Sequence, residues 1–336
     1  MSIKYQILGN PGGDNAMMVW INSGTRMHRL LFDCGEDLLK ELSYSDVSSI
    51  DHLFFSHLHL DHAAGFDYFL RRNYNRQNKP VIIWGPKNTA KIIANRLRGY
   101  TWNLTDKVPG RWEINDIYKN TITTSRFLTS EGFSRKHNSG KRVFKNFVFE
   151  NKDFKVTITE LNHIIPSIAY RVDEKPNLNI DKIQLKKSGL PSGPWLEKVK
   201  DLKIPSNKKI TIGHKRYSLK ELRNMLVKIN KGNSIAYLTD FIFDKGSSSR
   251  AIKLVKECET VVCESQYSNS DLELAKKNYH LTAPQSAQIA KSGGINKLIL
   301  FHISERYDVK EDYPGLLKEA NNIFRNTFFP EEWNII

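Results

Sequence analysis

The sequence predicts an α/β domain in which sheets are covered by helices, and three patterns support this class. Short β-branched or apolar runs alternate with helical periodicity, strands precede helices in both halves, and hairpin-like strand pairs lie near the N-terminus. The expected strands are 3–8, 16–21, 29–33, 52–56, 81–84, 155–160, 167–172, 234–239, 260–264 and 297–302. The expected helices are 36–42, 62–72, 87–98, 218–229, 247–257, 284–292 and 312–323. Helix 284–292 has a start signal, because Thr282 can cap it and Pro284 suits its first turn.

One segment, residues 174–216, breaks this alternation. It holds four prolines and little periodicity, and residues 185–216 carry nine basic and two acidic side chains, a local charge of +7. A long irregular stretch inside a domain is usually functional or disordered. We interpret it as a protruding, flexible arm at 177–216, inserted into a single domain that spans 1–336, rather than as a domain boundary.

The composition is that of a globular chain with a strong basic excess. The 336 residues carry a net charge of +15, which favours a polyanionic partner such as nucleic acid or an anionic membrane surface. A basic but inert surface is the alternative. The three cysteines (Cys34, Cys258 and Cys263) form no CxxC pair, so we expect buried thiols and a reducing compartment. Without a signal peptide or an apolar run long enough to cross a membrane, the expected location is cytoplasmic.

The densest chemical signal is Ser56-His-Leu-His-Leu-Asp-His62, which follows a predicted strand. His57 and His59 are two residues apart and share a face, and the turn that follows brings Asp61 and His62 toward the same space. Three imidazoles and a carboxylate suit zinc or another borderline divalent metal. The alternative, a solvated histidine-rich turn, would not need the flanking strand or Gly65.

This string resembles the metal-binding signature of the metallo-β-lactamase superfamily. His163, Asp240 and His302 follow at strand ends in the order that the superfamily requires, although each alone would pass for a loop residue. The resemblance implies an αββα sandwich and two divalent ions, zinc or alternatively manganese. It implies that His57, His59 and His163 hold one ion, that Asp61, His62 and His302 hold the other, and that Asp240 bridges them.

Further motifs narrow the resemblance to the ribonuclease Z family of tRNA 3′-processing endonucleases. Glu264 with His280-Leu-Thr-Ala-Pro-Gln-Ser-Ala is similar to the family's Glu and His-Ser-Thr loop, with Leu281 in place of Ser. His302-Ile-Ser-Glu-Arg-Tyr307 is close to the family's His-Phe-Ser-x-Arg-Tyr, and Leu31–Glu36 resembles its early strand and turn. Ser188–Lys198 looks like the Gly-Pro-rich motif of its flexible arm, which grips the tRNA elbow.

The resemblance implies hydrolysis of precursor tRNA that leaves a 3′-hydroxyl on the tRNA, by a homodimer. Asp61 would orient or deprotonate the attacking water, and His280, oriented by Glu264, would protonate the leaving oxygen. The candidate substrate-binding residues are Ser304, Arg306, Gly193, Pro194, Trp195 and Lys198. Arg306 could equally form a structural ion pair, and Trp195 could pack the arm on itself instead of stacking on RNA.

Four positions depart from the family pattern. The opening turn Gly9–Asn15 leads into Ala16 rather than paired serines, Phe241 follows Asp240 in place of Thr, Ala169 replaces a glycine, and Leu281 replaces Ser. These departures leave open an alternative, a phosphodiesterase of the same fold that acts on cyclic or short nucleotides. A non-catalytic RNA-binding protein is disfavoured by the complete ligand set. The remaining basic residues are expected on solvated helix faces: Arg71, Arg72, Arg76, Lys91, Arg96 and Arg98.

Overall fold

The computed structural model describes residues 3–24, 26–145 and 147–335, and the chain divides into two units. The main unit comprises residues 1–173 and 233–336, and the inserted unit comprises Glu174–Gly232. The segment expected to be an arm, 177–216, lies within the inserted unit.

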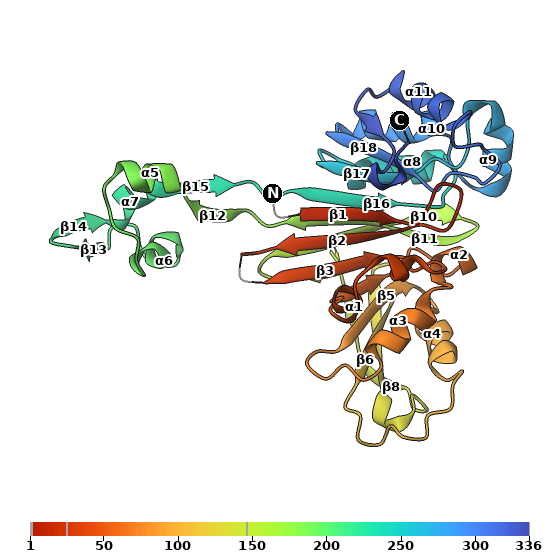
Figure 1. Cartoon of the computed structure of the whole chain (residues 1–336), viewed down its shortest axis with the longest axis horizontal. Coiled ribbons are helices and arrows are strands. Elements are labelled where there is room, and N and C mark those ends of the chain that lie inside the picture. The colour runs from red at the N-terminus through yellow and green to blue at the C-terminus, as the bar shows by residue number, and fades with distance from the viewer. Residues whose placement is uncertain (1–2, 25, 146, 336) are drawn as a thin grey trace. The chain divides into compact units, whose positions relative to one another are not determined.

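The main unit is built on two sheets (Figure 1). The first has strand order β1 to β8, with β3 through β6 parallel and the other neighbours antiparallel. Its strands are β1 (Ile3–Leu8), β2 (Ala16–Asn22), β3 (Met27–Phe32), β4 (His52–Phe54), β5 (Val81–Pro86), β6 (Arg111–Tyr118), β7 (Thr121–Leu128) and β8 (His137–Val143). The second sheet has the order β19-β18-β17-β16-β11-β10-β9, and β16 to β19 are parallel. Its strands are β9 (Phe149–Glu150), β10 (Phe154–His163), β11 (Ile165–Glu174), β16 (Ser234–Leu238), β17 (Thr260–Glu264), β18 (Lys297–Phe301) and β19 (Thr327–Phe328).

Strand periodicity divides the apolar side chains between two cores. Along β2, Met17 and Val19 enter the core shared by the two sheets, whereas Met18 enters the core under the helices of the first sheet. On β3, Phe32 likewise faces the second sheet, where its ring lies 5.6 Å from that of Tyr170. Successive residues of a strand point to opposite faces, so continuous apolar runs are expected for strands buried on both sides.

Helices cover the outer face of each sheet, which completes a helix–sheet–sheet–helix order (Figure 1). On the first sheet these are α1 (Tyr44–Ser48), α2 (Leu60–Ala63), α3 (Phe66–Asn73) and α4 (Thr89–Leu97); with the second go α8 (Lys245–Val255), α9 (Leu272–Asn278), α10 (Ala283–Gly293) and α11 (Tyr313–Asn321). The predicted αββα sandwich is confirmed. As predicted, Thr282 stands at the start of α10, where its N–H donates to Gln285 Oε1 at 3.0 Å. All three cysteines are buried free thiols.

Several elements differ from their predicted extents. The helix expected over 62–72 is two helices, because the Gly65 N–H donates to the Cys34 carbonyl oxygen at 2.9 Å and does not continue the hydrogen bonds of α2. The helix expected over 36–42 is a short 3₁₀ turn at Leu38–Glu41. Strands β6, β7 and β8 have no counterpart among the predicted strands, since their exposed faces carry polar residues that weaken the apolar signal.

Residues 174–216 of the inserted unit were predicted to be irregular, and that expectation is wrong, because the unit is built of regular elements. It contains β12 (Asn177–Ile180) paired with β15 (Val227–Asn230), and β13 (Lys209–Ile212) paired with β14 (Lys215–Ser218). It also contains α5 (Lys182–Lys187), α6 (Trp195–Lys200) and α7 (Leu219–Leu226). Helix α7 corresponds to the helix predicted over 218–229, but it ends at Leu226. These elements bury a small core of their own, which includes Val199, Leu219, Leu222 and Leu226. Short elements separated by prolines hide their periodicity, which is why the sequence pattern was misleading.

Within the described residues, every helix is too short or too polar to cross a membrane.

Candidate metal centre

The histidine-rich string lies where the first sheet ends. Strand β4 stops at Phe54, and the chain leaves the sheet through Ser56 before α2 begins at Leu60. The ring centroid of His57 lies 4.4 Å from that of His59 and 4.3 Å from that of His62. Asp61 Oδ2 lies 3.2 Å from His62 Nε2, so the predicted turn does bring all four side chains together.

Three further residues reach the same place from the second sheet. His163 ends β10, Asp240 follows β16 by two residues, and His302 follows β18 directly. Strands β16, β17 and β18 are parallel neighbours, so their carboxyl ends meet at one edge of the sheet. The sequence placed these residues at strand ends, and the sheet order brings the ends together.

In the described part of the chain, the potential ligand atoms form three groups, of which two share one aspartate and the third is Glu264, His280 and His302. The first two groups contain the predicted ligands. One group is His57, His59, His163 and Asp240, the other is Asp61, His62, Asp240 and His302, and within each group the atoms lie within 4.8 Å of one another. Asp240 Oδ2 lies 3.7 Å from His57 Nε2, 3.6 Å from His163 Nε2 and 3.4 Å from His62 Nε2. Asp240 Oδ1 lies 3.6 Å from His302 Nε2.

These donors fit divalent metal ions. His57 Nε2 and His62 Nε2 are buried and have no hydrogen-bond partner in the described chain. A buried polar atom without a partner is costly, so its retention needs a cause. Imidazole nitrogens and carboxylate oxygens that converge around a common point supply that cause, because they are the ligands that zinc and similar ions prefer.

A fully buried carboxylate, Asp33, orients the second group. Its Oδ2 accepts a hydrogen bond from His62 Nδ1 at 2.8 Å and from the Tyr237 hydroxyl at 2.9 Å. Its Oδ1 accepts from the Ser56 N–H at 2.7 Å. A carboxylate behind a metal-facing imidazole fixes the ring and its tautomer. Asp33 lies within the Leu31–Glu36 motif, but no role was predicted for it. Its sequence signal as a site residue is that it is a polar residue at the end of a strand.

A second imidazole is oriented by the main chain, because His163 Nδ1 donates to the Tyr279 carbonyl oxygen at 2.9 Å. His302 is held through its backbone instead, since its main-chain N–H donates to Asn15 Oδ1 at 3.2 Å. Asn15 ends the opening turn that departs from the family pattern. No role was predicted for Tyr279 or Asn15, since no local sequence pattern shows that a backbone carbonyl or a side-chain amide will accept a hydrogen bond from a histidine of the site.

The backbone at the site is held in an unusual conformation. Asp33, Ile164, Asp240, Tyr279 and His302 all have positive φ, between 50° and 63°. This left-handed region costs non-glycine residues about 1–2 kcal/mol each. Ile164 is the least expected of them, because it is β-branched, and its side chain is 76% exposed. Such residues cluster at functional sites, where the surrounding structure holds the strained backbone in place.

The electrostatics of the centre keep its carboxylates ionised. Burial would raise the pKa of the Asp240 carboxyl, but the imidazoles of His302 and His62 outweigh burial and hold its pKa well below the ordinary value. Burial likewise opposes ionisation of Asp61, but the neighbouring imidazoles of His302 and His62 outweigh burial and lower its pKa. Burial among other imidazoles lowers the pKa of His57. By contrast, burial would lower the pKa of His62, but Asp240 and Asp33 outweigh burial and raise it well above the ordinary value.

His280 and Glu264 form a pair beside the cluster. Glu264 is fully buried at the end of β17, and its Oε2 accepts from His280 Nδ1 at 2.8 Å. Burial lowers the pKa of His280, but Glu264 and Asp240 outweigh it and raise the pKa to about 9. The His280 ring centroid lies 4.9 Å from that of His163 and 5.7 Å from that of His302.

Two departures from the family pattern contribute through their backbone. The Phe241 N–H donates to Glu264 Oε1 at 2.7 Å, and the Leu281 N–H donates to Glu264 Oε2 at 3.2 Å. Both side chains are buried. Because main-chain N–H groups hold the carboxylate, replacement of the usual hydroxyl side chains leaves this contact intact.

The remaining candidates have other surroundings. Ser304 lies two residues after His302, a member of the second group. The Arg306 side chain is exposed, and its Nη1 lies 3.4 Å from Asp271 Oδ1, which is the structural ion pair considered above. Gly193, Pro194, Trp195 and Lys198 all belong to the inserted unit, where Trp195 packs on the small core and its Nε1 donates to the Pro191 carbonyl oxygen at 3.0 Å.

The expectation of solvated helix faces fails for two basic residues. Arg76 is buried and donates to the carbonyl oxygens of Ile50 and Pro80, both at 2.6 Å. Arg96 pairs with Asp67 at 2.9 Å. The sequence shows that these side chains are charged, but it does not show which acceptor oxygens the fold places beside them.

Comparison with known proteins finds relatives of this sequence and of this fold. The family model described as "Anti-Pycsar protein Apyc1" matches residues 14–186. Ribonuclease Z of Deinococcus radiodurans is 36% identical over 331 residues, which cover 98% of each chain. Among solved structures, the metallo-β-lactamase fold protein YhfI from Bacillus subtilis has a TM-score of 0.57 at 13% identity, covering 97% of this chain and 95% of that one. The short form of human tRNase Z has a TM-score of 0.52 at 19% identity, covering 91% and 94%.

The αββα sandwich with its His/Asp cluster defines a protein of the metallo-β-lactamase fold. More particularly, the chain belongs to the ribonuclease Z family, and its residues 14–186 also belong to the Apyc1 family. The resemblance to ribonuclease Z stated from the sequence is thus confirmed.

Proposed function

We propose that the chain is a metal-dependent endoribonuclease that hydrolyses a phosphodiester at the 3′ end of precursor tRNA and leaves a 3′-hydroxyl on the tRNA. The observation that carries this proposal is the similarity to a curated ribonuclease Z along 98% of both chains. The two-group ligand cluster supports it chemically, since a pair of ions can stabilise both the attacking and the leaving oxygens of an in-line displacement at phosphorus.

In this proposal the two groups hold two divalent ions, zinc or alternatively manganese. One ion would be held by His57, His59 and His163 and the other by Asp61, His62 and His302, with Asp240 between them. When bound, such ions lower the pKa of water and neutralise charge on phosphoryl oxygens. Asp33 would keep the His62 ring turned toward its ion.

The proton transfers are assigned to this chain's own side chains. Asp61 would accept a hydrogen bond from the attacking water and orient it toward phosphorus. Because Nδ1 of His280 faces Glu264, the proton for the leaving 3′-oxygen would come from Nε2. Glu264, fixed by the N–H groups of Phe241 and Leu281, would hold His280 in the protonated form.

Two broader features complete the proposal. We expect a homodimer. We also expect a reducing, cytoplasmic setting, and the three buried free thiols support that setting. Ser304 and Arg306 would contact phosphate near the second group. The inserted unit, through Gly193, Pro194, Trp195 and Lys198, would contribute to RNA binding.

The decisive experiment is cleavage of a precursor tRNA that carries a 3′ trailer, with zinc or manganese added and the product ends mapped. We expect a single cut at the end of the tRNA body and none with Asp61→Ala. Hydrolysis of bis(p-nitrophenyl) phosphate without any cut in precursor tRNA would contradict the substrate but keep the site.

A second substrate class belongs in the same assay. A family other than ribonuclease Z matches residues 14–186, and Phe241 and Leu281 replace the hydroxyl residues usual for ribonuclease Z. We therefore keep cyclic and short nucleotides as the alternative. Turnover of these compounds faster than of precursor tRNA would favour that alternative.

A further inference from the structure

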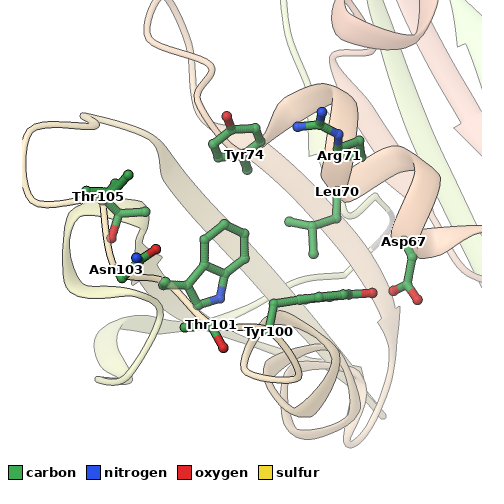
Figure 2. A pocket seen from close by; sticks show the side chains of 10 residues that line it. Asp67, Leu70, Arg71, Tyr74, Tyr100, Thr101, Asn103 and Thr105 are labelled. Atoms are coloured by element: carbon green, nitrogen blue, oxygen red, sulfur yellow. The ribbon is translucent and has the colours of Figure 1, made fainter.

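Apart from the metal centre, the main unit has a cavity of about 350 Å³ between α3 and residues 100–105 (Figure 2). Figure 2 shows Leu70 and Tyr74 on one side of it and Tyr100 on the other, with Arg71 beside Tyr74. None of its lining residues is a member of the metal centre. The volume falls in the range of small-molecule sites.

Three aromatic side chains line this cavity, and the indole of Trp102 is fixed in position. The Trp102 ring centroid lies 5.8 Å from that of Tyr74 and 6.1 Å from that of Tyr100. Trp102 Nε1 donates to the Leu97 carbonyl oxygen at 2.7 Å, and its ring packs edge-on against Phe133. The indole is therefore held before any ligand arrives, whereas the Tyr100 ring is 47% exposed and accessible to one.

The charges at this cavity suit an anion. Arg71 is exposed and has no hydrogen bond or ion pair within the described residues. Asp67, the carboxylate in the lining, is already paired with Arg96 at 2.9 Å. Of the two charged side chains that line the cavity, the anionic Asp67 is neutralised by Arg96, whereas the cationic Arg71 is not neutralised. A cationic ligand would meet the Arg71 guanidinium, so an aromatic cage for a cation is disfavoured.

We propose that this cavity binds one nucleotide of a single-stranded RNA, with its base among the aromatic rings and its phosphate paired with Arg71. Every base has a π face, so stacking on Tyr100 and Trp102 needs no particular sequence. A guanidinium without a partner matches a phosphate with two parallel hydrogen bonds. The inference deepens the proposed function and rests on it, since RNA is the substrate class assumed.

The test measures binding of a short fluorescent 2′-O-methyl oligoribonucleotide to the full-length protein by anisotropy, at several salt concentrations. We expect Tyr100→Ala to weaken binding about 5- to 50-fold through lost stacking. Arg71→Ala should weaken binding and reduce the salt slope by about 0.7, the value for one phosphate contact on a single strand. The matched controls are Tyr100→Phe, which keeps the ring, and Lys91→Ala, which removes an exposed charge outside the lining; both should bind within about twofold of wild type.

Hydrolysis of bis(p-nitrophenyl) phosphate by each variant, expected to be unchanged, shows that the metal centre is intact. If precursor tRNA is not cut by wild type but Tyr100→Ala still weakens binding, the proposed function fails and the cavity inference holds. If Tyr100→Ala and Arg71→Ala bind like wild type, the inference is overturned even where cleavage succeeds. It is also overturned if these variants change the sedimentation coefficient but not RNA binding, because the cavity is then a contact between copies.

Discussion

The metal centre and the inserted unit treat left-handed backbone in opposite ways. Among the described residues of Glu174–Gly232, positive φ occurs at two glycines, Gly189 and Gly213, where it costs little. At the metal centre it occurs at Asp33, Ile164, Asp240, Tyr279 and His302 instead. The inserted unit thus uses relaxed turns around a local core, whereas the centre bears strain to aim side chains at one point.

The two regions also differ in how far apart in sequence their parts lie. The centre joins His57 to His302 across both sheets, while the inserted unit draws its whole core from 59 consecutive residues. Local contacts form independently of distant ones, so each region should respond separately to change. The following experiments test that separation, from the largest expected effect to the smallest.

The largest effect should come from His62→Ala. Loss of a proposed ligand should lower cleavage by at least about 10³-fold, more than the 10- to 100-fold typical of outer partners. Single-turnover cleavage and bound metal measured by mass spectrometry check this, and near-ultraviolet circular dichroism checks the fold. His214→Ala, an exposed histidine of the inserted unit, is the matched control and should behave as wild type. Full activity in His62→Ala would refute the two-group assignment.

Deletion of the inserted unit should separate RNA binding from chemistry. Asp173 pairs with Ser234 between β11 and β16, so a short Gly-Ser linker can replace residues 175–231. Because many cations are lost, we expect tRNA affinity to fall about 10- to 100-fold and its salt slope to flatten. Hydrolysis of bis(p-nitrophenyl) phosphate should stay within about twofold, since the ligand groups lie outside the deletion. Loss of both activities would mean that the unit is needed for the main fold.

Asp33→Asn tests the carboxylate behind His62. The substitution keeps the size of the side chain but removes its charge, so the imidazole is oriented less firmly. Metal affinity or activity should drop about 10- to 100-fold. Asp37→Asn is the control, because Asp37 also has positive φ yet is exposed and outside the ligand groups. Equal effects of the two substitutions in a metal titration would remove Asp33 from the site.

The smallest effect should be a gain in stability from Ile164→Gly. Relief of the positive φ at a β-branched residue should exceed the entropy cost of glycine, for a net gain of about 1 kcal/mol in the free energy of unfolding. Ile165→Gly, one residue along in β11 and without positive φ, should lose stability instead. Urea denaturation of both variants measures the difference. A loss of stability in Ile164→Gly would show that this backbone is unstrained.

Short-range patterns in the sequence were sufficient for much of the fold, and together with the family resemblance they named the proposed ligands. Short β-branched or apolar runs predicted most strands of both sheets, because a strand buried on both faces carries apolar side chains on each. The two-residue spacing of His57 and His59 predicted a shared face. Strand ends predicted His163, Asp240 and His302, because polar residues that follow buried strands stand at the sheet edge.

Other features exist only where distant segments meet. The hydrogen bond from His62 to Asp33, the N–H groups that hold Glu264, and the aromatic cavity around Trp102 all join residues that have no local signature. At the break between α2 and α3, the Gly65 N–H donates to the carbonyl oxygen of Cys34, 31 residues away. Side-chain type and spacing are local properties that a chain carries before it folds, whereas partners, burial and backbone strain arise from packing.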